Sequence, residues 1–337
     1  MGLHVVFSNR LEILKDILLE DLARIPADPF EAQHVVVPGT AISRYLQLAI
    51  ADEKGICANV AFDYPGSWLW KLARLVDDKV PERSAVDPEI MTWMILRILG
   101  DNRLAAYPRL AGFIQKADDL MLFELAQSVA HVFDHYATYR PDWLVAWSEG
   151  KRIKDFRDEC ADEAKVYEEW QMEIWRAVTQ ELKLGSTHPL KIFLDKIMTG
   201  KTAGTASGLP GRASVFALPV IPPIYLQTIC RLSEVMDITF YLLNPCREYW
   251  FDIVPPRQLA YLKKIGREAH TEIGNPLLAD WGRATQSAID LIYDEASSAN
   301  TLETSRFVEP EGRELLAQLQ RSIFNMQELD PGSVQLP

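Results

Sequence analysis

The amino-terminal part of the chain alternates short apolar runs with amphipathic segments. Leu3–Phe7 is apolar and ends at polar residues, and residues 10–23 then carry leucine and isoleucine at helical spacing, which predicts a strand followed by a helix. A second β-branched run, His34–Val37, precedes helical spacing from Ile42 to Ala49. Two strand–helix units in succession predict a parallel sheet covered by helices.

A long block of helical periodicity interrupts this pattern. Apolar residues recur at a spacing of 3.6 from about Ser67 to Leu194, which predicts an all-helical segment. A Gly/Ser/Thr-rich stretch over 199–208 predicts a flexible loop, and strands are expected at 214–218 and 238–243, on either side of a helix at 225–235. These strands are too few for two sheets, so the pattern favours one α/β domain with a helical insertion.

The remainder of the chain, beyond Asn244, is predicted to be mostly helix and loop. The expected helices cover residues 258–267, 286–293 and 313–328, and the chain finishes in a linker-like Asp-Pro-Gly-Ser from residue 330.

Composition limits the class of protein. The 337 residues include 48% hydrophobic and 24% charged residues, which excludes disordered, collagen-like and coiled-coil classes and suggests about two domains. No apolar stretch reaches the ~20 residues of a membrane span, and the amino terminus lacks signal-peptide features. We therefore expect a cytoplasmic protein without a membrane partner. The net charge of −12 argues against non-specific coating of nucleic acid but permits a local DNA site.

The four cysteines predict neither a disulfide framework nor a structural zinc site. Cys57, Cys160, Cys230 and Cys246 are scattered and include no Cys-x-x-Cys pair, so reduced and mostly buried thiols are expected.

The turn Val37-Pro-Gly-Thr40 is a candidate nucleotide site, because a strand that enters a helix through a glycine turn can present backbone amides to phosphate. A Walker loop needs GxxxxGK[ST], whereas this turn has one glycine, no lysine and an arginine only at Arg44. A plain turn or a remodelled P-loop is the alternative. The match at Gly200-Lys-Thr202 follows a helical pattern rather than a strand, so we interpret it as coincidental.

Two histidines lie four residues apart in the helical block, at His131 and His135, with Asp134 between them. This is the spacing of helical zinc ligands, but the order HxxDH matches neither HExxH nor HxxEH. The other interpretation is a polar helix face that meets a partner or DNA, with Phe133 and Tyr136 on the core side.

The nine tryptophans are numerous for this length, and Trp68, Trp70, Trp143 and Trp147 lie in or beside the helical block. Packing in the core is one interpretation. Stacking on unpaired bases is the other.

Several blocks of residues resemble, in order, the amino-terminal part of the RecC family, the gamma subunit of exodeoxyribonuclease V. The blocks are residues 4–11 (HVVFSNRL), 28–31 (DPFE), 55–59 (GICAN), 139–143 (YRPDW), 222–227 (PPIYLQ), 244–247 (NPCR) and 274–279 (GNPLLA), with the nearby Tyr249-Trp250 and Trp281-Gly282 pairs. They span nearly the whole chain, and blocks of this length are more specific than any single motif above.

This resemblance implies a helicase-like, RecA-like parallel-sheet fold derived from P-loop proteins, with a degenerate nucleotide site. It implies a first part of the core domain at residues 1–70, an all-helical inserted subdomain at 71–204, and a second part of the core at 205–337 that ends in a linker to missing carboxyl-terminal domains. The chain would then be about the first third of such a subunit, as a truncated product or one part of a split gene.

The resemblance also implies a function. A non-catalytic subunit of this family splits the incoming duplex and guides the 3′-ending single strand. It also reads the recombination hotspot Chi during double-strand-break repair by homologous recombination. The expected partners are single-stranded and forked DNA, a RecB-like helicase-nuclease and a RecD-like helicase. ATP and Mg²⁺ would be used by those partner subunits, with no cofactor in this chain.

By the resemblance, the strand-reading positions of the family fall on ten residues, eight of which are proposed as the DNA site. Those that match the family pattern are Thr40, Trp70, Asp134 and Arg140, which supply a hydroxyl, an indole, a carboxylate and a guanidinium for bases or phosphate. Arg44, Tyr64, His131 and His135, together with Pro38 and Val132, stand where the family has different side chains. A good base contact is worth about 1–3 kcal/mol of discrimination, so these differences are expected to relax or redirect sequence specificity.

Two other functions fit the same sequence. A divergent NTPase or helicase domain would use the turn at Pro38 and would bind ATP. A protein-binding scaffold would use its aromatic surface to dock partner subunits only, and would have no affinity for DNA.

Overall fold

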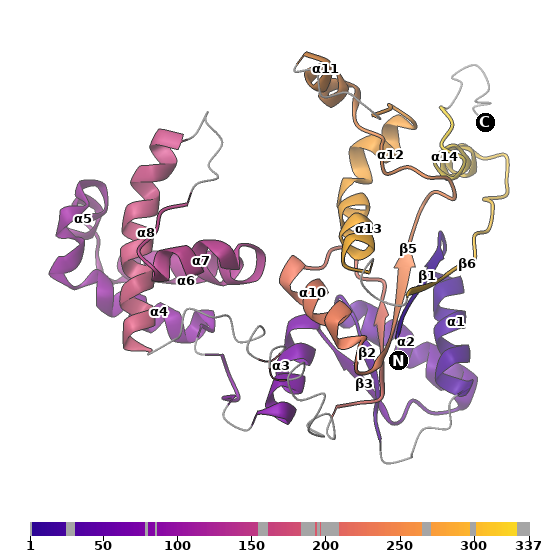
Figure 1. Ribbon diagram of the computed structural model, residues 1–337, viewed down its shortest axis with the longest axis horizontal. Helices are drawn as coiled ribbons and strands as arrows, with labels where there is room; N and C mark the ends of the chain where they lie inside the picture. The colour runs from indigo at the N-terminus through magenta and orange to yellow at the C-terminus, as the bar shows by residue number, and fades with distance from the viewer. Residues whose placement is uncertain are drawn as a thin grey trace. The chain divides into compact units, whose positions relative to one another are not determined.

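The chain divides into two compact units in the computed structural model. The described residues are 2–24, 31–77, 80–84, 86–153, 161–182, 193, 196, 209–264, 271–296 and 301–328. The sheet unit comprises residues 1–71, 206–221 and 225–337, and the helical unit comprises residues 72–205 and 222–224 (Figure 1). The loop predicted over 199–208 lies outside the described residues, as does the chain end from residue 329.

The sheet unit contains six strands that all run parallel. Their bounds are β1 Gly2–Ser8, β2 Gln33–Val36, β3 Val60–Asp63, β4 Arg212–Phe216, β5 Asp237–Leu243 and β6 Thr301–Ser305. Their order across the sheet is β3-β2-β4-β5-β1-β6. The apolar residues of the inner strands are buried on both faces of the sheet, as expected of a parallel sheet covered by helices. The predicted α/β class with a parallel sheet is confirmed.

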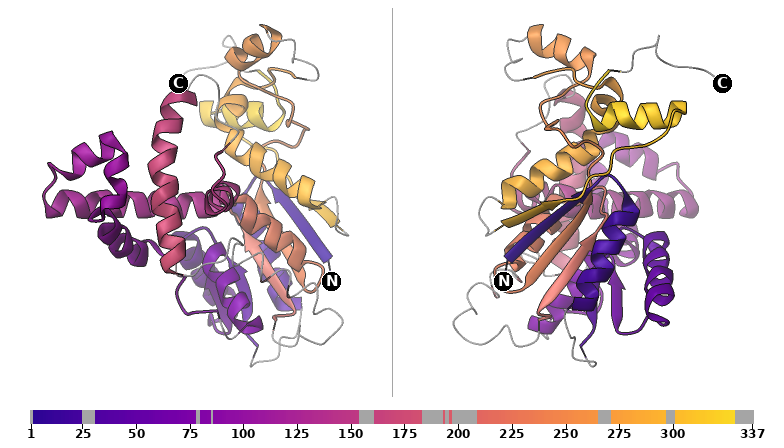
Figure 2. Two further views of the ribbon diagram at one scale, coloured as in Figure 1. Left: turned by 60° about the vertical axis from the view of Figure 1, so that its left-hand side comes forward. Right: turned by 90° about the vertical axis from the view of Figure 1, so that its right-hand side faces the viewer.

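Helices cover both faces of this sheet. Their bounds in this unit are α1 Leu11–Arg24, α2 Thr40–Lys54, α10 Pro223–Leu232, α11 Pro256–Lys264, α12 Pro276–Trp281, α13 Arg283–Ala296 and α14 Leu315–Phe324. Leu14 and Leu18 of α1 share one core with Leu46 and Ile50 of α2. The helices α10 and α13 lie on the opposite face (Figure 2). This division follows from right-handed crossovers, because the connections through α1 and α2 run across the sheet in the direction opposite to those through α10 and α13.

Two strands differ from the sequence-based expectations. The stretch Val60–Asp63 forms the edge strand β3, which pairs with β2 alone, although its four residues gave no clear period. The prediction of helix and loop beyond Asn244 is wrong at β6, the opposite edge, where four of the five residues are exposed. Edge strands need not be apolar on both faces, so a search for hydrophobic runs does not detect them.

The helix bounds also differ from the periodicity in places. The helix α3 covers Pro65–Val76, so helical structure begins two residues before the predicted Ser67, although the residues of α3 up to Lys71 belong to the sheet unit. The helix α14 is shorter at both ends than the predicted 313–328, α13 is longer than 286–293, and α11 begins two residues before the predicted 258. Periodicity locates a helix better than it locates its ends.

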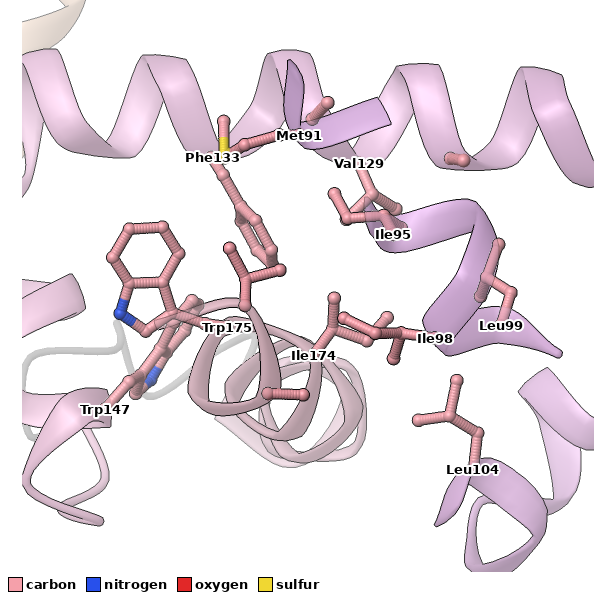
Figure 3. Close-up of a cluster of buried hydrophobic side chains, with 14 of the residues drawn as sticks. Met91, Ile95, Ile98, Leu99, Leu104, Val129, Phe133, Trp147, Ile174 and Trp175 are labelled. Atoms are coloured by element: carbon pink, nitrogen blue, oxygen red, sulfur yellow. The ribbon is translucent and has the colours of Figure 1, made fainter. Parts of the chain in front are cut away.

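The helical unit has its own core. Besides the end of α3 it contains α4 Pro88–Leu99, a 3₁₀ turn Asn102–Ala106, α5 Pro108–Ile114, α6 Asp119–Tyr139, α7 Pro141–Ser148 and α8 Ala161–Glu181. Phe133, Trp147, Ile174 and Trp175 point toward one another from α6, α7 and α8 (Figure 3). The ring centroids of Phe133 and Trp175 lie 5.5 Å apart, edge to face. Although α6 and α8 each span 21 residues, no described helix is long and apolar enough to cross a membrane.

A compact cluster ties the chain after β5 to α12 and α13. The Asn244 side chain accepts hydrogen bonds from the Trp250 indole and the Cys246 amide. The Gln286 side chain donates to the carbonyl oxygens of Trp250 and Phe251. At Gly282 a Cβ atom would lie 2.4 Å from the Leu278 carbonyl oxygen and 2.7 Å from the Trp250 ring. The backbone of α12 therefore approaches the indole more closely than any residue with a side chain would allow.

We expect Gly282→Ala to destabilise the sheet unit by roughly 1–3 kcal/mol, because the added methyl group overpacks a buried contact. Gly211→Ala is the matched control, since a Cβ there meets nothing within 4 Å. Urea unfolding followed by tryptophan fluorescence measures both. Equal stability of the two variants would contradict the close packing of Trp250 on Gly282.

Candidate nucleic-acid interface

Two βα turns of the sheet unit place candidate residues at one edge of the sheet. Thr40 is the first residue of α2, four residues after the end of β2, and Tyr64 directly follows β3. Because β2 and β3 pair in parallel with Val36 opposite Asp63, both turns leave the sheet at its carboxyl edge. Thr40 and Tyr64 are both exposed there.

Two cationic residues and one aromatic residue lie close in sequence to this edge. Arg44 is exposed one helical turn after Thr40 in α2, so the two residues share a side of that helix. Trp70 is half-buried in α3, which begins one residue after Tyr64. The next residue, Lys71, forms an ion pair with Asp63 at the end of β3. The first group of candidate residues thus combines a hydroxyl, two aromatic rings and a guanidinium along consecutive elements.

The glycine of the β2–α2 turn has no special backbone role. Gly39 has a φ of −176°, which is extended backbone open to any residue, and a Cβ there would meet nothing within 4 Å. Its neighbour Pro38 carries no amide hydrogen that could be donated to a phosphate. The local geometry is that of an ordinary strand-to-helix turn.

In the helical unit, α6 presents an exposed polar stripe. His131, Val132, His135 and Tyr139 are exposed along this helix, and the rings of His135 and Tyr139 have centroids 6.0 Å apart. Phe133 is fully buried on the other side, where Figure 3 shows it directed toward the core. Tyr136 is partly buried and packs against the same core. The interpretation of α6 as a helix with Phe133 and Tyr136 on its core side is therefore confirmed.

Asp134 lies half-buried at the margin of this stripe. Burial raises the pKa of its carboxyl group above the ordinary 3.8, and the nearby carboxylate of Asp87, the N-cap of α4, raises it further. The positive charges that His131 and His135 can carry act in the opposite direction. A carboxylate held where its charge is poorly solvated is a feature of functional sites more often than of stable surfaces.

Among the described residues, His131 and His135 are not part of a metal-binding cluster. Across the part of the chain that the structure describes, no group of three or more His, Cys, Asp or Glu side chains could hold a metal ion. The spacing of His131 and His135 thus places two rings on one exposed helix face without the donor set of a structural zinc site.

Arg140 stands at the junction between α6 and α7. Its guanidinium donates to both carboxylate oxygens of Asp142, from Nε at 3.3 Å and from Nη2 at 3.2 Å. It also lies over the Trp143 ring, with 4.3 Å between the guanidinium carbon and the ring centroid. The cation is therefore held by two neighbours on α7.

The four clustered tryptophans have two different environments. Trp68 and Trp147 are each 1% exposed, and the Trp147 indole donates to the Glu168 carboxylate at 3.0 Å. Trp70 and Trp143 are only partly buried. The packing interpretation thus accounts for Trp68 and Trp147, while Trp70 and Trp143 expose part of their rings.

Sequence reasoning missed three residues that shape these surfaces: Asp87, Asp142 and Lys71. A signal was available for Asp142, because an arginine followed by Pro-Asp places a carboxylate in the first turn of the next helix. Asp87 is separated from Asp134 by more than forty residues, so no local pattern connects the two.

The candidate residues fall into two groups. Thr40, Arg44, Tyr64 and Trp70 belong to the sheet unit, and His131, Asp134, His135 and Arg140 belong to the helical unit. Each group is exposed or half-buried within its own unit.

Comparison with known proteins identifies the family. The family described as RecC, N-terminal domain matches residues 3–326. The chain belongs to the RecC family. The RecBCD enzyme subunit RecC of Escherichia coli is 29% identical over 96% of this chain, and that of Haemophilus influenzae is 26% identical over 96%. The corresponding RecC subunit of Mycolicibacterium smegmatis is 25% identical over 84% of the chain.

The match covers only part of each relative. The chain spans 31% of the Escherichia coli RecC subunit and 33% of the Haemophilus influenzae subunit. What it shares with RecC is thus the amino-terminal third of a longer subunit.

We expect Asp134→Asn to raise the free energy of unfolding at pH 7. Since the folded chain raises the pKa of this carboxyl group, the contribution of Asp134 to stability is present in full below its ordinary pKa and is lost as the pH rises through the folded-state value. Asparagine has the shape of the aspartate side chain without its charge. The difference in the free energy of unfolding between variant and parent should therefore shrink toward zero as the pH falls below about 4.

Chemical denaturation of both proteins between pH 3 and pH 8 measures this effect. Glu124→Gln, at an exposed carboxylate of the same helix, is the matched control. A parent protein more stable than Asp134→Asn at pH 7 would show that the Asp134 charge is stabilising and that the assignment is wrong.

Proposed function

We propose that this chain is the non-catalytic, DNA-handling amino-terminal part of the gamma subunit of a RecBCD-type exodeoxyribonuclease V. It guides the 3′-ending single strand and reads a recombination hotspot of the Chi type during double-strand-break repair by homologous recombination. The observation that carries this proposal is the match to the RecC N-terminal domain over residues 3–326, with relatives named as RecC subunits of the RecBCD enzyme.

The chemistry of the exposed candidate residues supports a strand-reading role. Trp70 offers an indole for stacking on an unpaired base, and Thr40 and Asp134 offer groups that hydrogen-bond to base edges. Arg44, His131 and His135 are exposed groups that can bind phosphate or bases. Base edges are accessible on a single strand, so a small number of such side chains can confer sequence preference without a broadly basic surface.

An inactive, RecA-like helicase fold is the second part of the proposal. In a parallel α/β sheet, ligands bind where the chain connections diverge. The strands β2 and β4 are neighbours in the sheet, but the connection from β2 leads to β3 on one side and the connection from β4 leads to β5 on the other. The β2–α2 turn therefore lies where the connections diverge. Gly39 is extended, Pro38 has no amide hydrogen, and the turn contains no lysine. These features support a degenerate nucleotide site.

The polar side chains in the turn after β1 form hydrogen bonds within the protein. The Asn9 side chain donates to the Val308 carbonyl oxygen at 2.8 Å and accepts from the Val308 amide at 3.0 Å. The Ser8 hydroxyl accepts a hydrogen bond from the Arg10 amide. Polar groups that could meet a phosphate at this turn are thus used to hold the segment after β6.

The proposed organisation follows the family. Residues 1–70 and 205–337 form the first RecA-like core domain, and residues 71–204 form the inserted subdomain. The partners are single-stranded and forked DNA, a RecB-like helicase-nuclease and a RecD-like helicase, within the cytoplasm. ATP and Mg²⁺ are assigned to those partner subunits, and no cofactor is assigned to this chain.

We expect the chain to bind a labelled 3′-tailed DNA fork, with an affinity that falls as salt rises. Trp70→Ala and Arg140→Ala should each weaken binding about 5-fold or more without unfolding the chain, since base stacking is worth roughly 1–3 kcal/mol per base. Fluorescence anisotropy at two salt concentrations measures the affinity, and circular dichroism checks the fold. Trp281→Ala is the control, because Trp281 is 83% exposed but lies outside the candidate residues.

Unchanged affinity of the folded Trp70→Ala and Arg140→Ala variants would contradict the assigned site. No DNA binding at any salt concentration would favour the scaffold that only docks partner subunits.

We expect no saturable ATP binding at the β2–α2 turn. Gly39→Ala should leave both the fold and the DNA affinity unchanged, since its backbone is extended and the space is open. Isothermal titration calorimetry with Mg²⁺-ATP tests whether the chain binds ATP. Saturable binding that Thr40→Ala abolishes would instead establish a divergent NTPase.

A further inference from the structure

The backbone around Arg140 is fixed by two helices. Its amide donates to the Tyr136 carbonyl oxygen at 2.8 Å, which ends α6, and its own carbonyl accepts from the Trp143 amide at 3.0 Å, which begins α7. Pro141 occupies the first position of α7, where its ring restricts the backbone further. Arg140 is therefore presented from a rigid corner rather than from a loop.

Its side chain is held on two sides. Asp142 engages Nε and Nη2, which form one of the two bidentate edges of the guanidinium. The guanidinium carbon lies over the Trp143 ring, 4.3 Å from its centroid, and Tyr136 packs against that indole, with 5.2 Å between ring centroids. Tyr136 in turn packs against the core of the helical unit. A chain of contacts thus connects the orientation of the guanidinium to the folded core.

This arrangement determines which part of Arg140 is available to a ligand. Bidentate binding of a phosphate or a guanine uses either the Nε–Nη2 edge or the Nη1–Nη2 edge of a guanidinium, and here the Asp142 carboxylate occupies the Nε–Nη2 edge. The carboxylate of Asp142 would also repel a phosphate placed beside it. The Nη1–Nη2 edge begins at the same Nη2 and so lies beside that carboxylate, which leaves the face away from Trp143 as the surface best suited to an uncharged base; the Arg140 side chain is 40% exposed.

We propose that Arg140 is a stacking platform for an unpaired base, with Asp142 and Trp143 as its positioning residues. This inference rests on the proposed single-strand function and specifies how one residue of that site acts. A nucleobase would lie on the free face of the guanidinium, continuing the Trp143–Arg140 stack. Asp142 keeps the plane in place and neutralises its charge, so Arg140 contributes to base contact rather than to phosphate attraction.

The experiment compares a single-stranded oligonucleotide with one of the same length that carries abasic sites, each titrated with the full chain at four salt concentrations. Arg140→Lys keeps the charge and removes the plane. It should weaken binding to the normal strand by about 5- to 100-fold, leave binding to the abasic strand nearly unchanged, and leave the salt dependence unchanged. Asp142→Asn should also reduce the preference for the normal strand over the abasic strand, by a smaller factor than Arg140→Lys does.

Phosphate binding by Arg140 gives the opposite pattern. Arg140→Gln would then weaken both strands equally and lower the slope of log affinity against log salt by about 0.7, the value for one lost phosphate contact on a single strand. Asp142→Asn would strengthen binding, because it removes the carboxylate that occupies the Nε–Nη2 edge and repels phosphate. Either result overturns the inference while leaving the DNA-binding function intact. Absence of binding by the parent chain overturns the proposed function itself, and the inference with it.

A second readout does not depend on affinity. The base analogue 2-aminopurine, placed at successive positions of the oligonucleotide, should lose fluorescence at one position when the parent chain binds, as expected for a stacked base. Arg140→Lys should restore that fluorescence at saturating protein. Trp93→Phe is the control, because Trp93 is 65% exposed in the same unit but lies on α4. Equal quenching by parent and Arg140→Lys would contradict stacking on the guanidinium.

Discussion

Parallel pairing of all six strands is the constraint on which the rest of this structure depends. A parallel strand is reached only by a crossover, so every connection must leave the carboxyl edge and return across a face of the sheet. The turns after β2 and β3 therefore emerge at the same edge, and this brings Thr40 and Tyr64 to one side of the sheet unit. The same rule places α1 and α2 on one face and α10 and α13 on the other.

A crossover also accommodates the insertion. The helical unit occupies the connection between β3 and β4, where added chain leaves the register of β2 with both neighbours unchanged. The insertion has its own core around Phe133, Trp147 and Trp175, which packs α6, α7 and α8 together. The buried side of α6 in turn determines which residues of that helix are exposed.

The candidate residues lie among residues that stabilise the fold. Burial of Phe133 and Tyr136 stabilises α6, whereas the half-buried carboxyl group of Asp134 lies where its charge is disfavoured. Arg140 depends on Asp142 and Trp143 for its orientation. Residues that stabilise the fold and residues suited to base contact thus alternate along the same short stretch of chain.

The sequence by itself determined the α/β class, the helical insertion and the core side of α6. Hydrophobic periods of two and 3.6 residues indicate which face of a strand or helix is buried, and they can be identified from neighbouring residues alone. The family resemblance, now supported by the match over residues 3–326, likewise required only the order of short blocks. Only the tertiary structure decided that Val60–Asp63 and Thr301–Ser305 are edge strands, because pairing with a neighbour, rather than burial, defines them. It also decided that the charge of Asp87 acts on Asp134 and that Asp142 and Trp143 contact Arg140. Such interactions depend on where helices end and how they cross, and a periodic sequence pattern contains no information about either.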